Sequence, residues 1–283
     1  MRTPAFSVVS TALLLGGGAL AKRHGQSDTT CVDGSLVAHT GDPLGEEVVT
    51  NDNITLYITK PDGENQRAKA REGTAVLYLS DVFGLALPEN KLLADSYARA
   101  GYLTIAPDLF AGEPAPGDIN VPGFNTTAFL AAHEPSVTDP IIASTLTYLR
   151  TELNVTRVAA PGYCFGGRYA FRLLSPSPIE GAWTEGIDVA FAAHPSLLES
   201  GEITAIGAPV AIASADNDTL FTAEARAAAE QDLFGVGQRY QVNLYSGTEH
   251  GFGVRVDLTD EQQKYAKEEA FVQAVKWFDR FLV

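Results

Sequence analysis

The segment Gly162-Tyr163-Cys164-Phe165-Gly166 combines a reactive side chain with two glycines at a fixed spacing. A Gly-x-nucleophile-x-Gly pattern between a strand and a helix is typical of a nucleophile elbow, and Cys164 holds the nucleophile position. A β-branched run over 155–158 precedes the pattern, and a helical segment over 169–174 follows it. The sharp turn explains the glycines, since a side chain there would crowd the nucleophile. The alternative is that Cys164 is a buried core cysteine in a tight turn.

Two more reactive side-chain types follow predicted strands further along the chain. Asp216 and Asp218 come after the strand predicted over 209–214, and His250 comes after the strand predicted over 239–244. Ligands bind at the carboxyl ends of parallel strands, so we expect these residues to lie near Cys164. A histidine would take the thiol proton, and an aspartate would fix the histidine tautomer. We favour Asp218 as the acid, with Asp216 as the alternative, although both suit an ordinary turn.

The order nucleophile, acid, base is that of α/β-hydrolases. Strand patterns alternate with helical patterns, which predicts an α/β fold with a mostly parallel central sheet and helices on both faces. We expect one domain over 31–283, a polar loop over 65–72 and a Pro- and Gly-rich surface loop or lid over 107–122. A strand or hairpin is predicted over 47–58, and further strands over 74–79, 102–105 and 187–193. The further helices are predicted over 90–100, 140–153, 222–233 and 260–282.

The chain is acidic, with a formal net charge of -15. An acidic surface repels nucleic acid and anionic membranes, so we expect neither as a partner. The charge also has a simpler reading, since it keeps a protein soluble. The sequence leaves open whether the protein is a monomer or a homodimer.

The N-terminus has the pattern of a secretory signal peptide over residues 1–21. Arg2 precedes an apolar run over 5–15 and the small-residue site Ala19-Leu20-Ala21, and the run is too short to span a bilayer. We therefore expect a secreted protein, with Lys22-Arg23 as a weak further processing signal. Four glycosylation sequons support export, of which the last is expected to stay unmodified; they begin at Asn53, Asn125, Asn154 and Asn217.

The cysteine count adds one expectation. The chain contains two cysteines, Cys31 and Cys164. Secreted chains usually pair their cysteines. A bridge between these two would block the nucleophile, so we expect no disulfide.

From about Cys31 to the C-terminus, the chain resembles the dienelactone hydrolases, especially their fungal relatives. The resemblance implies an α/β-hydrolase fold and hydrolysis of a lactone or enol ester by Cys164, His250 and Asp218, without a metal or organic cofactor. It also implies an oxyanion hole formed by the backbone N–H groups of Val82 and Phe165. The motifs that carry it are Leu79-Ser-Asp-Val-Phe-Gly84, Ala106-Pro-Asp-Leu-Phe110, Gly162-Tyr-Cys-Phe-Gly-Gly167, Asp218-Thr-Leu-Phe221 and Glu249-His-Gly-Phe252.

Two departures from the family pattern concern the substrate. Bacterial members have a glutamate after the first central strand, where this chain has the shorter Asp81. Their carboxylate-binding loop arginine is missing, which leaves Arg168 and Arg255 as candidate carboxylate partners or plain surface charges. His194, at another strand end, is a further candidate for the pocket, with a purely structural role as the alternative. Other functions in view are a general carboxylesterase, a hydrolase that tailors a secondary-metabolite lactone, and a non-catalytic secreted protein that binds a small molecule.

Overall fold

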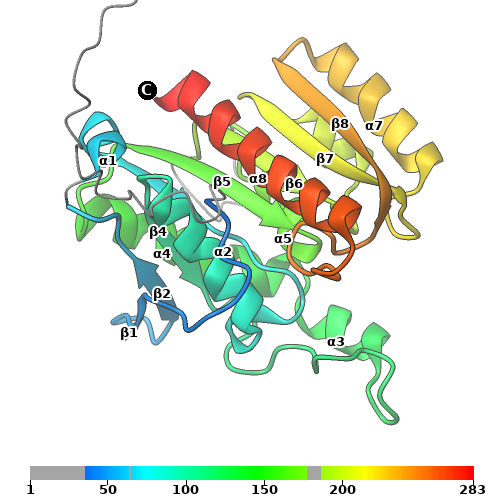
Figure 1. Ribbon diagram of the computed structural model, residues 1–283, viewed down its shortest axis with the longest axis horizontal. Helices are drawn as coiled ribbons and strands as arrows, with labels where there is room; N and C mark the ends of the chain where they lie inside the picture. Colours follow the sequence, from blue (N-terminus) through cyan, green and yellow to red (C-terminus); the bar gives the residue numbers. More distant parts are fainter. Residues whose placement is uncertain (1–35, 64, 177–185) are drawn as a thin grey trace, which may run out of the picture. The chain divides into compact units, whose positions relative to one another are not determined.

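The computed structural model describes residues 36–63, 65–176 and 186–283, and these residues contain an eight-stranded sheet (Figure 1). The strand order is β1-β2-β4-β3-β5-β6-β7-β8. The pairs β1·β2 and β2·β4 are antiparallel, and every other neighbouring pair is parallel. The strands are β1 Glu46–Val49, β2 Thr55–Thr59, β3 Thr74–Leu77, β4 Leu103–Pro107, β5 Arg157–Tyr163, β6 Val189–Ala193, β7 Val210–Asn217 and β8 Tyr240–Glu249.

Helices cover both faces of the sheet, as the sequence predicts (Figure 1). The central strands are apolar at successive positions because both of their faces are buried. In β3, Ala75 and Leu77 pack on the side of α4, α5 and α7, whereas Val76 packs on the side of α2 and α8. The helices are α1 Gln66–Ala70, α2 Pro88–Arg99, α3 Thr126–Ala132, α4 Pro135–Thr151, α5 Phe165–Arg172, α6 Ser200–Thr204, α7 Ala223–Val236 and α8 Glu261–Leu282; a 3-10 turn, η1, spans Gly84–Ala86.

Short helices are the main difference from the sequence prediction. The segment 65–72 is not a loop throughout, since α1 lies within it, and α3 and α6 were not predicted. Neither α1 nor α3 buries a residue, so neither has an apolar stripe that a sequence pattern could reveal. Both begin at an asparagine whose side chain accepts a backbone N–H: Asn65 from Arg67 and Asn125 from Ala128.

Proline misled the prediction of α4. The helix begins at Pro135 and contains Pro140, five residues earlier than the predicted start. Proline is common in the first turn of a helix, and the predicted start was placed at Pro140 rather than at Pro135.

Several predictions for the N-terminal region lie outside the described residues. These are the signal peptide over 1–21, the Lys22-Arg23 site and the pairing state of Cys31. Across 36–63, 65–176 and 186–283, no helix is both long enough and apolar enough to cross a bilayer. The asparagines of all four sequons are exposed at the surface: Asn53, Asn125, Asn154 and Asn217.

The parallel part of the sheet brings three strand ends to one edge. β5 ends at Tyr163, directly before Cys164, and β8 ends at Glu249, directly before His250. β7 ends at Asn217, directly before Asp218. The sheet therefore delivers a thiol, an imidazole and a carboxylate to the same region of the molecule.

Candidate active site

Cys164 occupies a strained turn between β5 and α5. Its φ of 52° and ψ of −112° lie in a region that residues with a side chain rarely adopt. Backbone bonds on both sides hold the turn: the Cys164 N–H donates to Ala193 O at 3.1 Å, and the Ser196 N–H donates to Cys164 O at 3.0 Å. The turn has the strand–turn–helix geometry that the sequence predicts for a nucleophile elbow.

The glycines around Cys164 are required by contact. A Cβ added at Gly162 would lie 2.2 Å from Gly166 O, and one added at Gly166 would lie 2.2 Å from Leu79 O. Contacts below 3.0 Å force a backbone shift. The elbow can therefore approach β3 and its own helix only with glycine at both positions.

Asp218 and His250 meet because β7 and β8 pair out of regular register near their ends. The two strands pair residue by residue up to Ala215, and after a bulge Asn217 pairs with Glu249. The next residues of the two strands are Asp218 and His250, which therefore face each other. His250 Nδ1 lies 2.9 Å from Asp218 Oδ1 and 3.0 Å from Oδ2.

Asp216, the alternative acid, has another role at the same bulge. Its carboxylate accepts the backbone N–H of Gly247 at 3.0 Å and of Thr248 at 3.2 Å. It fixes the end of β8, two residues before His250. β-Bulges often re-aim a side chain beside a functional site, and the contacts of Asp216 hold this bulge in place.

The pair His250 and Asp218 is electrostatically coupled. Burial opposes the ionisation of Asp218, but hydrogen bonds from His250 and from the N–H groups of Phe221 and Leu220 hold its pKa below the usual value. Burial also opposes the charging of His250, yet Asp218 and then Cys164 raise the pKa of His250 to about 10. His250 is therefore an imidazolium at neutral pH.

Cys164 and His250 line one cavity of about 500 Å³. His250 Nε2 is buried and has no hydrogen-bond partner among the described residues. It can therefore exchange a proton or form a hydrogen bond with a group in this cavity. Asp81 and Arg255, both singled out in the sequence, line the same cavity. Within the described part of the chain, no three His, Cys, Asp or Glu side chains are grouped so that they could hold a metal ion.

Asp81 is held by a buried amide. Asn90 Nδ2 donates to Asp81 Oδ1 at 2.8 Å, and the Phe83 N–H donates to the same oxygen at 3.0 Å. Tyr78 in turn donates to Asn90 Oδ1 at 2.7 Å. Burial nevertheless raises the pKa of Asp81. No hydrogen bond joins Asp81 to Cys164 in the described structure, which agrees with the shorter reach of aspartate.

Two backbone N–H groups are available beside the thiol. Phe165 is the first residue of α5, so its N–H has no partner within the helix. Neither this N–H nor that of Val82 makes a hydrogen bond in the described structure. Val82 follows Asp81 and lines the cavity. These are the two donors that the family resemblance implies for an oxyanion hole.

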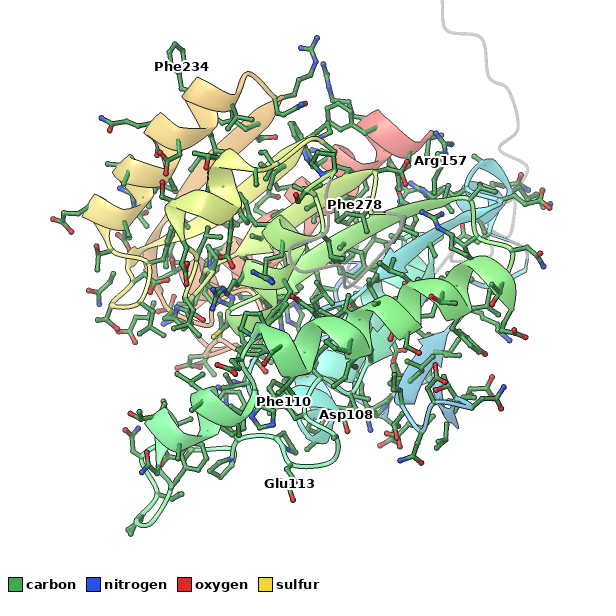
Figure 2. The ribbon with its side chains drawn as sticks, turned by 180° about the vertical axis from the view of Figure 1, so that it is seen from behind. Asp108, Phe110, Glu113, Arg157, Phe234 and Phe278 are labelled. Carbon is green, nitrogen blue, oxygen red and sulfur yellow. The ribbon has the colours of Figure 1, made fainter. Side chains whose placement is uncertain are left out.

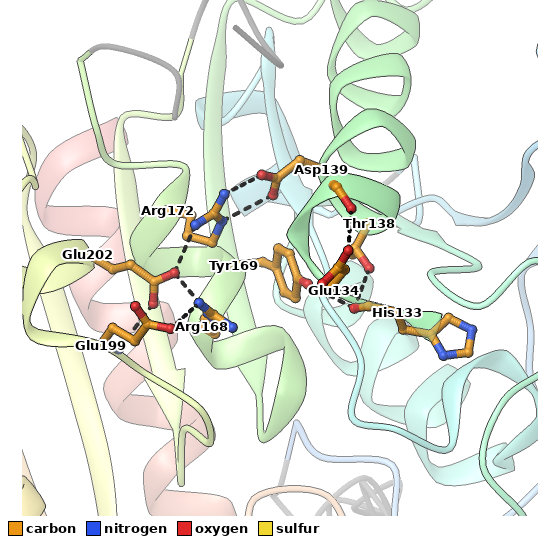
Figure 3. A network of polar contacts seen from close by, with 10 residues as sticks. His133, Glu134, Thr138, Asp139, Arg168, Tyr169, Arg172, Glu199 and Glu202 are labelled. Carbon is orange, nitrogen blue, oxygen red and sulfur yellow. Dashed lines mark hydrogen bonds and ion pairs between the residues drawn. The ribbon is translucent and has the colours of Figure 1, made fainter. Parts of the chain in front are cut away.

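Arg168 lies outside the cavity, in an ion-pair network behind the elbow (Figure 3). It contacts Glu199 at 2.7 Å and Glu202 at 2.8 Å. Arg172 contacts Glu202 at 2.8 Å and also pairs with Asp139 of α4. Both arginines belong to α5, so the network fixes the elbow helix between α4 and α6. With two carboxylates as partners, Arg168 is not available to bind a substrate anion.

Arg255 is the basic residue that the structure brings to the cavity. Its guanidinium lies 4.1 Å from the centre of the Phe83 ring, and its Nη1 donates to Gly117 O at 3.5 Å. No carboxylate pairs with it among the described residues. Of the two arginines proposed from the sequence, Arg255 is the one placed to bind an anion.

His194 is buried behind the cavity rather than in its wall. Neither of its ring nitrogens has a hydrogen-bond partner among the described residues, and burial lowers its pKa well below the ordinary value. Its ring packs edge-on against His250 with centroids 5.0 Å apart, and its φ is 38°. His194 therefore supports the orientation of His250 by packing, as a neutral ring.

Sequence reasoning missed several residues of the site. Ser196 Oγ lies 3.6 Å from Cys164 Sγ, and Asn90 holds Asp81. Ser196 follows the His194-Pro195 pair at the end of β6, and this position was the signal that could have identified it. No sequence pattern indicates the role of Asn90, because an asparagine in a helix can make many other contacts.

The raised pKa of His250 links stability to pH. The protonated ring stabilises the folded state fully below pH 6.5, and that contribution is lost as the pH rises toward about 10. We expect the urea midpoint of the wild type to fall more between pH 6.5 and pH 10 than that of His250→Gln, because glutamine does not titrate. Equal losses in the two proteins would contradict this coupling.

Comparisons with known proteins identify the family of the chain. The model of the dienelactone hydrolase family matches residues 54–282. Hydrolase pyvD of Aspergillus violaceofuscus is 40% identical over 252 residues, which cover 89% of this chain and 96% of the relative. Hydrolase tropI of Talaromyces stipitatus is 35% identical over 263 residues, which cover 90% and 97%. A solved dienelactone hydrolase from Anabaena variabilis has a TM-score of 0.57 at 16% identity, over 85% of this chain and 98% of that one. The predicted family and α/β-hydrolase fold are thereby confirmed: the chain belongs to the dienelactone hydrolase family of carboxylic ester hydrolases.

Proposed function

We propose that this protein hydrolyses a lactone or an activated enol ester through a thioester on Cys164, with His250 and Asp218 as its partners. One observation carries the proposal. His250 is bonded through Nδ1 to Asp218, its Nε2 is unpartnered, and it lines the same cavity as the elbow cysteine. In this arrangement an imidazole exchanges protons with a nucleophile while a carboxylate holds its tautomer.

The first half of the proposed reaction forms the thioester. The Cys164 thiolate attacks the ester carbonyl, and the N–H groups of Val82 and Phe165 donate to the resulting oxyanion. One such donor is worth about 3–4 kcal/mol of barrier. The tetrahedral intermediate expels the alkoxide or enolate, which takes a proton from the His250 imidazolium.

The second half releases the acid. His250, now neutral, takes a proton from water, and the hydroxide that forms attacks the thioester carbonyl. The thiolate leaves as the carboxylic acid departs, and the imidazolium is restored. The high pKa of His250 suits its role as the acid that protonates the leaving group, because the ring carries that proton at neutral pH.

Arg255 supports a substrate that carries a negative charge near the ester. Its guanidinium has no carboxylate partner in the described structure and lies at the wall of the cavity. Arginine binds carboxylates well because its planar fork offers two parallel donors. We propose that it orients a substrate carboxylate, while Asp81, in the lining of the same cavity, is held by Asn90 and the Phe83 N–H through one oxygen.

Replacement of the nucleophile is the first test. We expect Cys164→Ala to abolish hydrolysis of p-nitrophenyl acetate and of a dienelactone, while circular dichroism stays unchanged because alanine fits the buried turn. Activity that persists in Cys164→Ala would remove Cys164 from the mechanism.

A pair of aspartate variants tests the identity of the acid. We expect Asp218→Asn to lower kcat/KM by about 10²–10⁴-fold, the range typical of general acid–base catalysis, because His250 loses the carboxylate that orients it. Asp216→Asn is the comparison variant: its amide oxygen can still accept a backbone N–H of β8 and so keep the bulge, and we expect a smaller loss than in Asp218→Asn. A larger loss in Asp216→Asn than in Asp218→Asn would reverse the assignment.

A further inference from the structure

The cavity extends well beyond the groups that react. Its volume of about 500 Å³ lies within the range of pockets that hold drug-sized ligands, about 300–1,000 Å³. Residues between 117 and 130, the segment that contains α3, line the cavity together with the reactive groups. We refer to this segment as the α3 arm. Figures 1 and 2 show that the α3 arm extends away from the layers of helices around the sheet.

Apolar side chains of the α3 arm form this part of the wall. Ile119, Phe124, Phe129 and Leu130 line the cavity, and none of the four is fully buried. No residue of α3 is fully buried. Phe129 and Leu130 of this helix are partly buried against the core, and their remaining apolar surface lines the same cavity as Cys164.

Two other loops contribute to the same apolar rim. Leu197, after β6, is 45% exposed, and Leu220, after β7, is 57% exposed, while Ile119 of the arm is 40% exposed. All three line the cavity. Single exposed apolar residues are ordinary, but several that gather around one pocket mark a binding surface.

Leu197 has a backbone conformation at the cavity rim that leucine rarely adopts. Its φ of 58° is a left-handed conformation that suits glycine or asparagine and is rare for a branched side chain. Strained backbone persists where the surrounding structure enforces it, and such residues cluster at ligand sites.

The α3 arm is joined to the elbow by a series of tilted ring–ring contacts. Ring centroids are 5.6 Å apart between Phe124 and Phe129, 5.5 Å between Phe129 and Phe110, and 5.3 Å between Phe110 and Phe165. Phe165 directly follows the nucleophile. Rings at such distances attract one another beyond the area that they bury, so the arm is a fixed wall rather than a free loop.

We propose that the α3 arm, Leu197 and Leu220 form a subsite for a bulky apolar group, preferably aromatic, on the ester or lactone substrate. The proposal rests on the hydrolase function above and names its substrate class: esters and lactones of large apolar acids or alcohols rather than small polar lactones. A flat ring would pack against Phe124 and Phe129 and cover the leucines of the rim.

Two pairs of esters test the subsite, one for each side of the bond. These are p-nitrophenyl acetate with p-nitrophenyl hexanoate, and phenyl acetate with 2-naphthyl acetate. We expect the larger member to have the higher kcat/KM in at least one pair, by about two- to fourfold for each added methylene that is buried in the acyl series. The variants Phe124→Ser and Leu197→Gly should reduce this ratio, and glycine also relieves the strain at position 197.

Phe234→Ser is the matched control. Phe234 is 79% exposed on α7, does not line the cavity, and lies far from the α3 arm in Figure 2. It should leave the ratio unchanged. Ratios near one in the wild type for both pairs, or ratios that neither cavity variant alters, would overturn the subsite without touching the hydrolase function.

Binding of 2-naphthol separates the two proposals. Calorimetry on the Cys164→Ala protein should show that 2-naphthol binds more tightly than phenol, and that adding Leu197→Gly weakens it. If no ester is turned over but this preference holds, the hydrolase proposal fails and the apolar site stands. Equal binding of the two phenols would overturn the site.

Discussion

The hydrogen bond between His250 and Asp218 is the interaction on which the candidate site depends. It exists because β7 and β8 shift register near their ends, so that Asn217 pairs with Glu249 and the two following residues face each other. Asp216 stabilises the shift by accepting two backbone N–H groups of β8. The same bond raises the pKa of His250 and so sets the charge beside Cys164. Without the bulge, the two side chains would not be brought face to face.

The strain of the elbow is balanced by the packing around it. Cys164 keeps its unusual backbone because β3 and β6 hold the turn on either side and glycines allow close approach. Ion pairs from Arg168 and Arg172 fix α5 to α6 and α4 (Figure 3). Contacts between tilted phenyl rings fix the α3 arm to the same helix. A rigid helix behind the nucleophile keeps the Phe165 N–H in place, which is the condition for stabilising an oxyanion. The reactive residues and the apolar wall of the cavity are thus both fixed by contacts to α5.

The sequence predicted the features that leave periodic or spaced patterns. The parallel strands, the elbow and the order of Cys164, Asp218 and His250 all carry such patterns. The sequence favours Asp218 over Asp216 but leaves Asp216 open, because their contacts depend on a two-residue shift in the register of β7 and β8. Arg168 and Arg255 were equally plausible anion partners until the structure placed Arg168 between two glutamates. The α3 arm begins inside the loop or lid expected over 107–122, but α3 itself was not expected, since a helix without buried residues gives no apolar period. The contribution of the arm to the cavity depends on tertiary contacts alone.

The most direct test of the account is to locate the acyl group during turnover. The enzyme would be mixed with p-nitrophenyl acetate, quenched with acid within the first turnover, and its peptides examined by mass spectrometry. The account predicts an acetyl group on the peptide that contains Cys164, attached to the sulfur, and a longer-lived adduct in His250→Gln. An acetyl group on Ser196, whose hydroxyl lies 3.6 Å from the sulfur, would contradict it, as would turnover without any covalent adduct.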